Sequence, residues 1–109
     1  MNDFNEIDRY LVDPEPFFGY LASIKTLERW GAVDEKTSLI ENYLRFWESL
    51  PLFYQNIQKL LLNERIGYQG MVYRKAAANI KTYISNHNSK KHVFIGFNAL
   101  NIAEQNIIQ

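Results

Sequence analysis

The stretch "NYLRFWESLPLFY", residues 42–54, decides how the chain folds, because it joins five aromatic residues to a proline. Apolar residues before the proline recur every three or four positions and cover an arc of about 160° of a helix, so this helix can touch two neighbours. Pro51 has no amide hydrogen and clashes with the preceding turn, so a helix ends or kinks there. We predict one helix up to Leu50 and another beyond it, with the aromatic side chains, Trp47 among them, buried in the core.

Residues that start and stop helices surround this stretch. Asp13 fits an N-cap and Pro14 the first helical position, which favours a helix from there to about Trp30. Gly31 is typical of a helix C-terminus, because glycine adopts the left-handed conformation freely. Asp34 then fits the N-cap of the next helix. With a further short helix near the N-terminus, the sequence favours a series of helices.

Two of the expected helices have apolar faces at helical period. In the helix that starts at Pro14, the predicted core residues are Phe17, Tyr20, Leu21, Ile24 and Leu27. A later helix, from about Met71 to Ser85, follows the glycine-rich turn at 66–70. Its predicted buried residues are Val72, Tyr73, Ala76, Ala77, Ile80, Tyr83 and Ile84. Its other side is polar.

The C-terminal tail, "VFIGFNALNIAEQNIIQ" from residue 93 onward, fits two structures. "HVFIGF" at 92–97 has the length and composition of a short buried strand. No second strand is available to pair with it, and four apolar residues of the tail also fit one helical face. We therefore predict a helix there, with Gly96 as its weak point and a short strand at 92–97 as the alternative.

Size and composition describe one globular domain. The chain of 109 residues is 47% apolar and 22% charged, which is typical of folded globular proteins and not of disordered chains. No apolar run approaches the ~18 residues of a membrane span. The acidic N-terminus is not typical of a signal peptide, and the absence of cysteine fits a reducing compartment. We therefore expect a cytoplasmic domain spanning 1–109, without membrane insertion.

Charge is divided unevenly along the chain, although the formal net charge is zero. Residues 1–64 hold six Lys/Arg and eleven Asp/Glu, which gives −5, and residues 65–109 hold six Lys/Arg and only Glu104, which gives +5. Two explanations fit this division. Either the halves attract each other within a bundle, or the basic half faces an acidic partner or nucleic acid.

No residue pattern nominates a catalytic, cofactor or metal site. The two histidines, His87 and His92, are five positions apart with no acidic residue near them, which is not a metal-ligand arrangement. The candidate carboxylate pairs lie at helix starts, where the helix dipole stabilises them. The sequence has no nucleophile elbow and no complete phosphate-binding loop. We expect a protein that is not an enzyme and that uses no cofactor or metal.

The basic helix at 71–85 gives the strongest remaining signal. Five cations gather on this helix and in the loop beyond it: Arg74, Lys75, Lys81, Lys90 and Lys91. With the preceding helix, it has a helix–turn–helix outline at 57–85, although the turn is longer and richer in glycine than usual. Binding to nucleic acid phosphates is therefore the alternative to binding a protein.

Residues 17–65 follow the order helix, glycine, Val-Asp, long helix, tryptophan, Leu-Pro and arginine-ended helix. The residues that carry this order are Leu27, Gly31, Val33, Asp34, Trp47 and Arg65. In this respect the segment resembles small helical bacterial proteins of unknown function, some of which carry a membrane helix upstream; we expect none here. The resemblance implies an all-α cytoplasmic domain and no particular activity.

Together these observations predict an all-α fold, a compact bundle of about five or six helices that binds another macromolecule. We expect a small non-catalytic protein-interaction module of a bacterium or phage, of the inhibitor, immunity or adaptor type. Its partner is expected to be a protein, with a second copy in a homodimer among the candidates. The alternatives are a nucleic-acid-binding regulator that uses the helix at 71–85 and, last, a small enzyme. The residues expected to contact a partner are Arg74, Lys75, Lys81, Lys90, Lys91, Phe18, Leu52 and Leu62.

Overall fold

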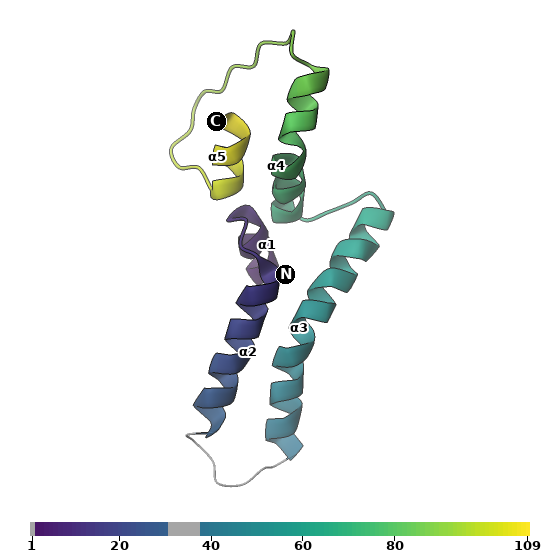
Figure 1. Cartoon of the computed structure of the whole chain (residues 1–109), viewed down its shortest axis with the longest axis vertical. Coiled ribbons are helices and arrows are strands. Elements are labelled where there is room, and N and C mark those ends of the chain that lie inside the picture. Colours follow the sequence, from purple (N-terminus) through teal and green to yellow (C-terminus); the bar gives the residue numbers. More distant parts are fainter. Residues whose placement is uncertain (1, 31–37) are drawn as a thin grey trace. The chain divides into compact units, whose positions relative to one another are not determined.

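The computed structural model describes residues 2–30 and 38–109, which form helices joined by turns and one long loop (Figure 1). Within these residues the helices are α1 (Asn2–Arg9), α2 (Pro14–Trp30), α3 (Ser38–Asn63), α4 (Gln69–Asn86) and α5 (Ile102–Ile108). The same residues form no strand. The prediction of an all-α fold is confirmed.

The chain divides into two compact units, and each is described by itself. The first unit, Met1–Val12 with Ile66–Gln109, contains α1, α4 and α5. The second unit, Asp13–Arg65, contains α2 and α3. The sequence predicts a single domain over 1–109, whereas contacts within the structure gather into these two units.

The first unit brings the N-terminal helix against the two C-terminal helices, because α1 packs on both α4 and α5. Phe4 and Ile7 of α1 are buried, as are Met71 of α4 and Ala103 of α5. Every helix of this unit therefore contributes to a small apolar core.

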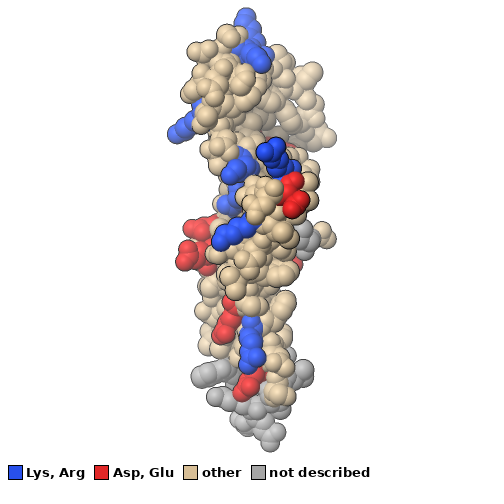
Figure 2. Space-filling model, turned by 90° about the vertical axis from the view of Figure 1, so that its right-hand side faces the viewer, with Lys and Arg blue, Asp and Glu red and all other residues tan. Residues whose placement is uncertain are grey.

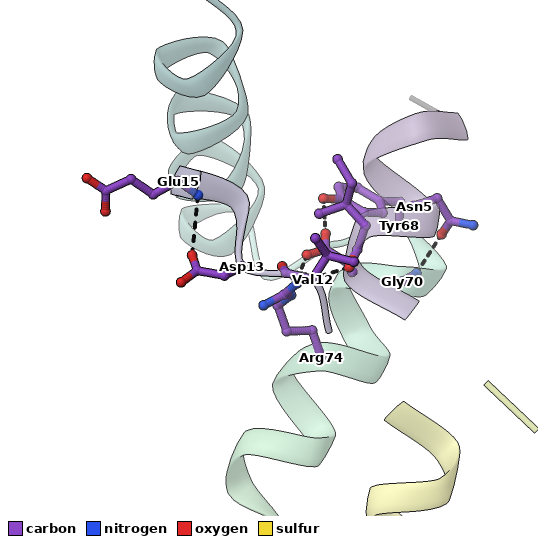
Figure 3. A network of polar contacts seen from close by, with 9 residues as sticks. Asn5, Val12, Asp13, Glu15, Tyr68, Gly70 and Arg74 are labelled. Carbon is purple, nitrogen blue, oxygen red and sulfur yellow. Dashed lines mark hydrogen bonds and ion pairs between the residues drawn. The ribbon is translucent and has the colours of Figure 1, made fainter. Parts of the chain in front are cut away.

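Gly70 allows α1 and α4 to approach closely. Its amide donates a hydrogen bond of 2.6 Å to Oδ1 of Asn5 (Figure 3). A Cβ atom at this position would lie 2.2 Å from the backbone oxygen of Asn5, so no side chain fits without a shift. The sequence predicts a turn at 66–70, but Gly70 already belongs to the first turn of α4.

α2 begins and ends where the sequence predicts. Oδ1 of Asp13 accepts a hydrogen bond of 3.3 Å from the amide of Glu15, so Asp13 caps the helix and Pro14 takes its first position (Figure 3). The predicted stop at Gly31 and the predicted cap at Asp34 lie outside the described residues.

α3 is one helix, whereas the sequence predicts a helix up to Leu50 and a new helix beyond it. Pro51 lies inside α3. It removes one hydrogen bond, to the carbonyl of Trp47, but the turns on either side remain helical. The ribbon of α3 changes direction partway along its length, as proline-containing helices do (Figure 1). The prediction of two helices is wrong, and a kink within one helix describes α3.

Residues 92–97 form neither the predicted helix nor the alternative strand. They belong to an irregular loop between α4 and α5. Gly96 has a φ of 85°, in the left-handed region that neither a helix nor a strand uses. Helix α5 starts only at Ile102, because Asn101 and Glu104 form a capping box that fixes its first turn.

The second unit is an antiparallel hairpin of α2 and α3 (Figure 1). Phe18, near the start of α2, packs on Tyr54, late in α3, with ring centroids 5.7 Å apart. Further along α2, the Nζ atom of Lys25 lies 5.6 Å over the ring of Trp47, which comes earlier in α3. Phe18 and Tyr54 are buried, and Trp47, which the sequence places in the core, is half-buried.

α2 meets α3 with a different face from the one predicted. Of the predicted core residues, Phe17, Tyr20 and Leu27 are exposed, while Phe18 is only 3% exposed. Phe18 follows Phe17 directly, so the helix is turned by about 100° from the predicted orientation. Three large side chains of the predicted stripe therefore remain on the surface, while Leu21 and Ile24 are half-buried.

Candidate interaction surfaces

A buried ion pair joins α1 to α4 in the first unit. Asp8 is completely buried, and its Oδ1 lies 2.6 Å from Nε of Arg74. The hydroxyl of Tyr68 donates a hydrogen bond to the other oxygen of the Asp8 carboxylate. A buried carboxylate is tolerated only when a cation and hydrogen bonds replace water, and these two side chains supply both.

Arg74 also holds the end of α1. Its Nη2 atom donates hydrogen bonds to the backbone oxygens of Ile7, at 3.0 Å, and Val12 (Figure 3). Both carbonyls lie at or beyond the last turn of α1, and the Ile7 oxygen also accepts a hydrogen bond of 3.0 Å from the Val12 amide. The sequence predicts that Arg74 projects away from the core towards a partner. That orientation is wrong, because the guanidinium is used within the fold.

The other predicted cations lie on the surface of the first unit. Lys75, Lys81, Lys90 and Lys91 are exposed, and none forms an ion pair with a described residue. In the upper part of Figure 2, lysine and arginine side chains stand at separate places with uncharged surface between them. The first unit therefore offers single cations rather than one continuous basic surface on this face.

Tyr83, near the C-terminal end of α4, contacts both histidines. The ring of His87 stacks on Tyr83 with centroids 4.4 Å apart, and its Nδ1 lies 3.0 Å from the backbone oxygen of Tyr83. The Tyr83 hydroxyl lies 3.0 Å from Nε2 of His92. These contacts fasten the start of the loop to α4. Sequence reasoning placed Tyr83 in the core, although its spacing of four from His87 indicates a contact on one helix face.

The loop between α4 and α5 exposes an apolar segment, residues 93–97. Val93 is 83% exposed and Ile95 86% exposed, and the two phenylalanines, Phe94 and Phe97, are about half exposed. No backbone group of residues 92–99 forms a hydrogen bond with a described residue. The peptide groups and the side chains of Val93 and Ile95 are therefore left to water, while the rings of Phe94 and Phe97 lie against each other with centroids 6.2 Å apart.

The three predicted apolar contact residues have different positions in the second unit. Phe18 is buried between α2 and α3, so the prediction that it contacts a partner is wrong. Leu52 and Leu62 are exposed, as expected. Most of their neighbours on that side of α3 are polar, for example Gln55 and Lys59. The two leucines are isolated on this side and do not form a surface.

A larger apolar surface lies elsewhere on the hairpin. We call it the apolar hairpin face, and its exposed members are Phe17, Tyr20, Leu27, Phe46, Phe53 and Leu60. The sequence predicts that the aromatic members and Leu27 lie in the core. The signal for a surface was the arc of about 160° on α3, which is wider than one neighbouring helix covers.

Lys25 lies at the edge of the contact between α2 and α3, which we call the seam. Nζ of Lys25 lies 3.0 Å from the Glu28 carboxylate. The hydrogen bond to Glu28, followed by its charge, raises the pKa of Lys25 above its ordinary value. Lys25 is therefore charged at neutral pH and sits over the ring of Trp47 as a cation.

The described residues contain no cluster of three or more histidine, cysteine or carboxylate side chains that would hold a metal ion. None of the helices in the described part of the chain is long and apolar enough to cross a membrane.

The candidate features on the described residues are exposed apolar surfaces and separate cations. Comparison with known proteins finds no matching family model, no similar curated protein and no similar solved structure, so the resemblance of residues 17–65 stays a prediction.

Proposed function

We propose that the protein is a small non-catalytic protein-interaction module of a bacterium or phage, of the inhibitor, immunity or adaptor type, acting in the cytoplasm. The exposed apolar segment at 93–97 carries this proposal. Val93 and Ile95 are its most exposed side chains, and a large apolar side chain is stabilised when a partner removes it from water.

The backbone of this segment supports a particular way of binding. Residues 92–99 form no backbone hydrogen bond with the described chain, so their peptide groups are free to pair with another protein. An unpaired segment of this composition adds to the edge of a partner's sheet once Gly96 leaves its left-handed conformation, a change that glycine makes at no steric cost. In that arrangement the main chain gives affinity, and alternate side chains such as Val93, Ile95 and Phe97 enter the partner's pockets.

Lys90 and Lys91 precede the segment and indicate the charge of the partner. Both are exposed, and a surface with acidic residues beside its binding edge would meet them. Charges at the rim of an interface act mainly on the rate of association and on specificity. We therefore propose a partner with an acidic rim around an apolar edge.

A nucleic-acid-binding regulator is the second candidate, and four exposed lysines favour it: Lys75, Lys81, Lys90 and Lys91. Arg74, the arginine best suited to a bidentate phosphate contact, is engaged with Asp8 instead. A protein partner uses the apolar segment as well as the lysines, whereas a phosphate backbone uses the lysines alone. We favour the protein partner for this reason.

Capture of partners from a lysate of the host cell, with and without nuclease, tests the proposal. Immobilised wild-type protein should retain a specific protein after nuclease treatment. Ile95→Asp should weaken this binding at least ~30-fold, because a charge replaces an apolar contact at the interface. Val72→Asp is the matched control, since Val72 is also exposed but lies on α4, and it should bind as the wild type does. Loss of all capture with nuclease would favour the regulator instead.

A further inference from the structure

The exposed apolar stripes of α2 and α3 lie on the same side of the hairpin. On α2, exposed Phe17 directly precedes buried Phe18, and on α3, exposed Phe53 directly precedes buried Tyr54. Each stripe is therefore offset from the seam by about 100° in the same rotational sense. Because the helices are antiparallel, equal offsets bring both stripes to one side. The apolar hairpin face is thus a single surface with contributions from both helices.

The stripe on α3 repeats at the period of a helical bundle. Its exposed members, Phe46, Phe53 and Leu60, are seven residues apart, and half-buried Leu50 and Ile57 lie between them. This spacing of three and four is the pattern with which helices pack along a shared seam. A second such pattern, which includes Trp47 and Tyr54, already faces α2. α3 therefore has one apolar row against α2 and a second row whose large side chains are exposed.

The open surface has the size of a protein interface. With about 200 Å² for a large side chain, the six exposed residues of the apolar hairpin face present roughly 700 Å² to solvent. Stable complexes bury about 800 Å² on each partner, and patches on monomers are usually smaller than about 600 Å². Four of the six residues are aromatic, the type that contributes most binding energy at interface centres.

The rim of this face suits an identical copy. A row of polar residues runs beside the stripe of α3, each three positions after a member of the stripe. The row consists of Ser49, Asn56 and Asn63, and Asn42, seven positions before Ser49, extends it. All four are uncharged and exposed. In a two-fold interface a residue meets its own copy only near the axis, and a like charge there costs affinity. The uncharged row puts no charge next to the stripe of α3, and the exposed Arg45 and Lys59 lie beyond it.

We propose that the apolar hairpin face binds a second copy of the chain, so that two hairpins of α2 and α3 complete a four-helix bundle. The proposal is independent of the segment at 93–97. Two-fold pairing ends at a dimer, because each copy covers the apolar hairpin face of the other and no such face remains exposed for a third copy. Antiparallel hairpins with short connections are a common way to build such a bundle.

The mass of the full chain in solution, measured by sedimentation equilibrium, tests the proposal. Wild-type protein should have twice the mass of one 12.9 kDa chain. Phe53→Asp should raise the Kd of the dimer at least ~100-fold, since it puts an unpaired charge in the interface. Leu62→Asp is the matched control, because Leu62 is also exposed, 45% against 56% for Phe53, and lies about 180° around α3 from it. It should leave the dimer intact.

Three results would overturn the proposal. Wild-type protein with the mass of a single chain would show that a different molecule, or none, covers the face. A mass above that of two chains would show that the pairing does not close. Equal dissociation by Phe53→Asp and Leu62→Asp would place the contact elsewhere. The wild-type mass needs no variant, so a variant that fails to fold, as shown by its circular dichroism, does not decide the outcome.

Discussion

At the scale of single residues, the position of Arg74 separates what the sequence predicts from what the structure contains. An arginine on the polar side of a helix is ordinarily exposed, and the sequence gives no sign of an acidic partner more than sixty positions away. The charge division along the chain was the available signal. Asp8 belongs to the acidic half of the sequence, residues 1–64, and Arg74 to the basic half, residues 65–109. Their ion pair is one contact in which the two halves attract each other.

Arg74→Ala should lower the free energy of unfolding by about 3–5 kcal/mol, because it leaves the buried Asp8 carboxylate without its cation. Urea unfolding followed by circular dichroism measures this change. Lys75→Ala is the matched control: it removes a neighbouring, exposed cation and should change stability by less than about 0.5 kcal/mol. Similar effects of the two substitutions would show that the ion pair does not stabilise the fold.

At the scale of helices, local sequence signals predicted where α2 starts, but the sequence did not predict which face of α2 is buried. Asp13 and Pro14 start α2 as expected, since capping depends on adjacent residues. The buried face of α2 was predicted wrongly because both Phe17 and Phe18 are apolar, and only contact with α3 decides between them. Pro51 was given too much weight, because a long helix tolerates the loss of one hydrogen bond. The candidate surfaces were missed because exposed apolar residues resemble core residues in a sequence.

Two glycines in helices should respond in opposite directions to alanine. Gly70→Ala should destabilise the protein by about 1–3 kcal/mol, because the new methyl group meets the backbone oxygen of Asn5. Gly19→Ala has open space around it in α2 and should stabilise by about 0.5–1 kcal/mol, since alanine favours the helix. Tm values of the two variants measure the difference. A stabilising Gly70→Ala would contradict the close packing of α1 on α4.

At the scale of the whole molecule, the second unit lacks what usually stabilises a helical hairpin. It buries Phe18 and Tyr54 fully, while the apolar hairpin face stays open. Helices in proteins gain most of their stability from packing an apolar face against another element, so a hairpin with its widest stripe in water is marginal by itself. A second copy supplies the missing cover. The stability of this unit should therefore increase with the fraction of chains that are paired in dimers.

The dependence of Tm on protein concentration tests this claim most directly. Trp47 is half-buried in the second unit, so its fluorescence follows the unfolding of the hairpin. If folding and pairing are coupled, Tm should rise by about 5–10 °C when the concentration rises about 100-fold, because mass action favours the assembled state. A Tm that stays constant across this range would contradict the account, since it would show that the hairpin is stable without a second copy.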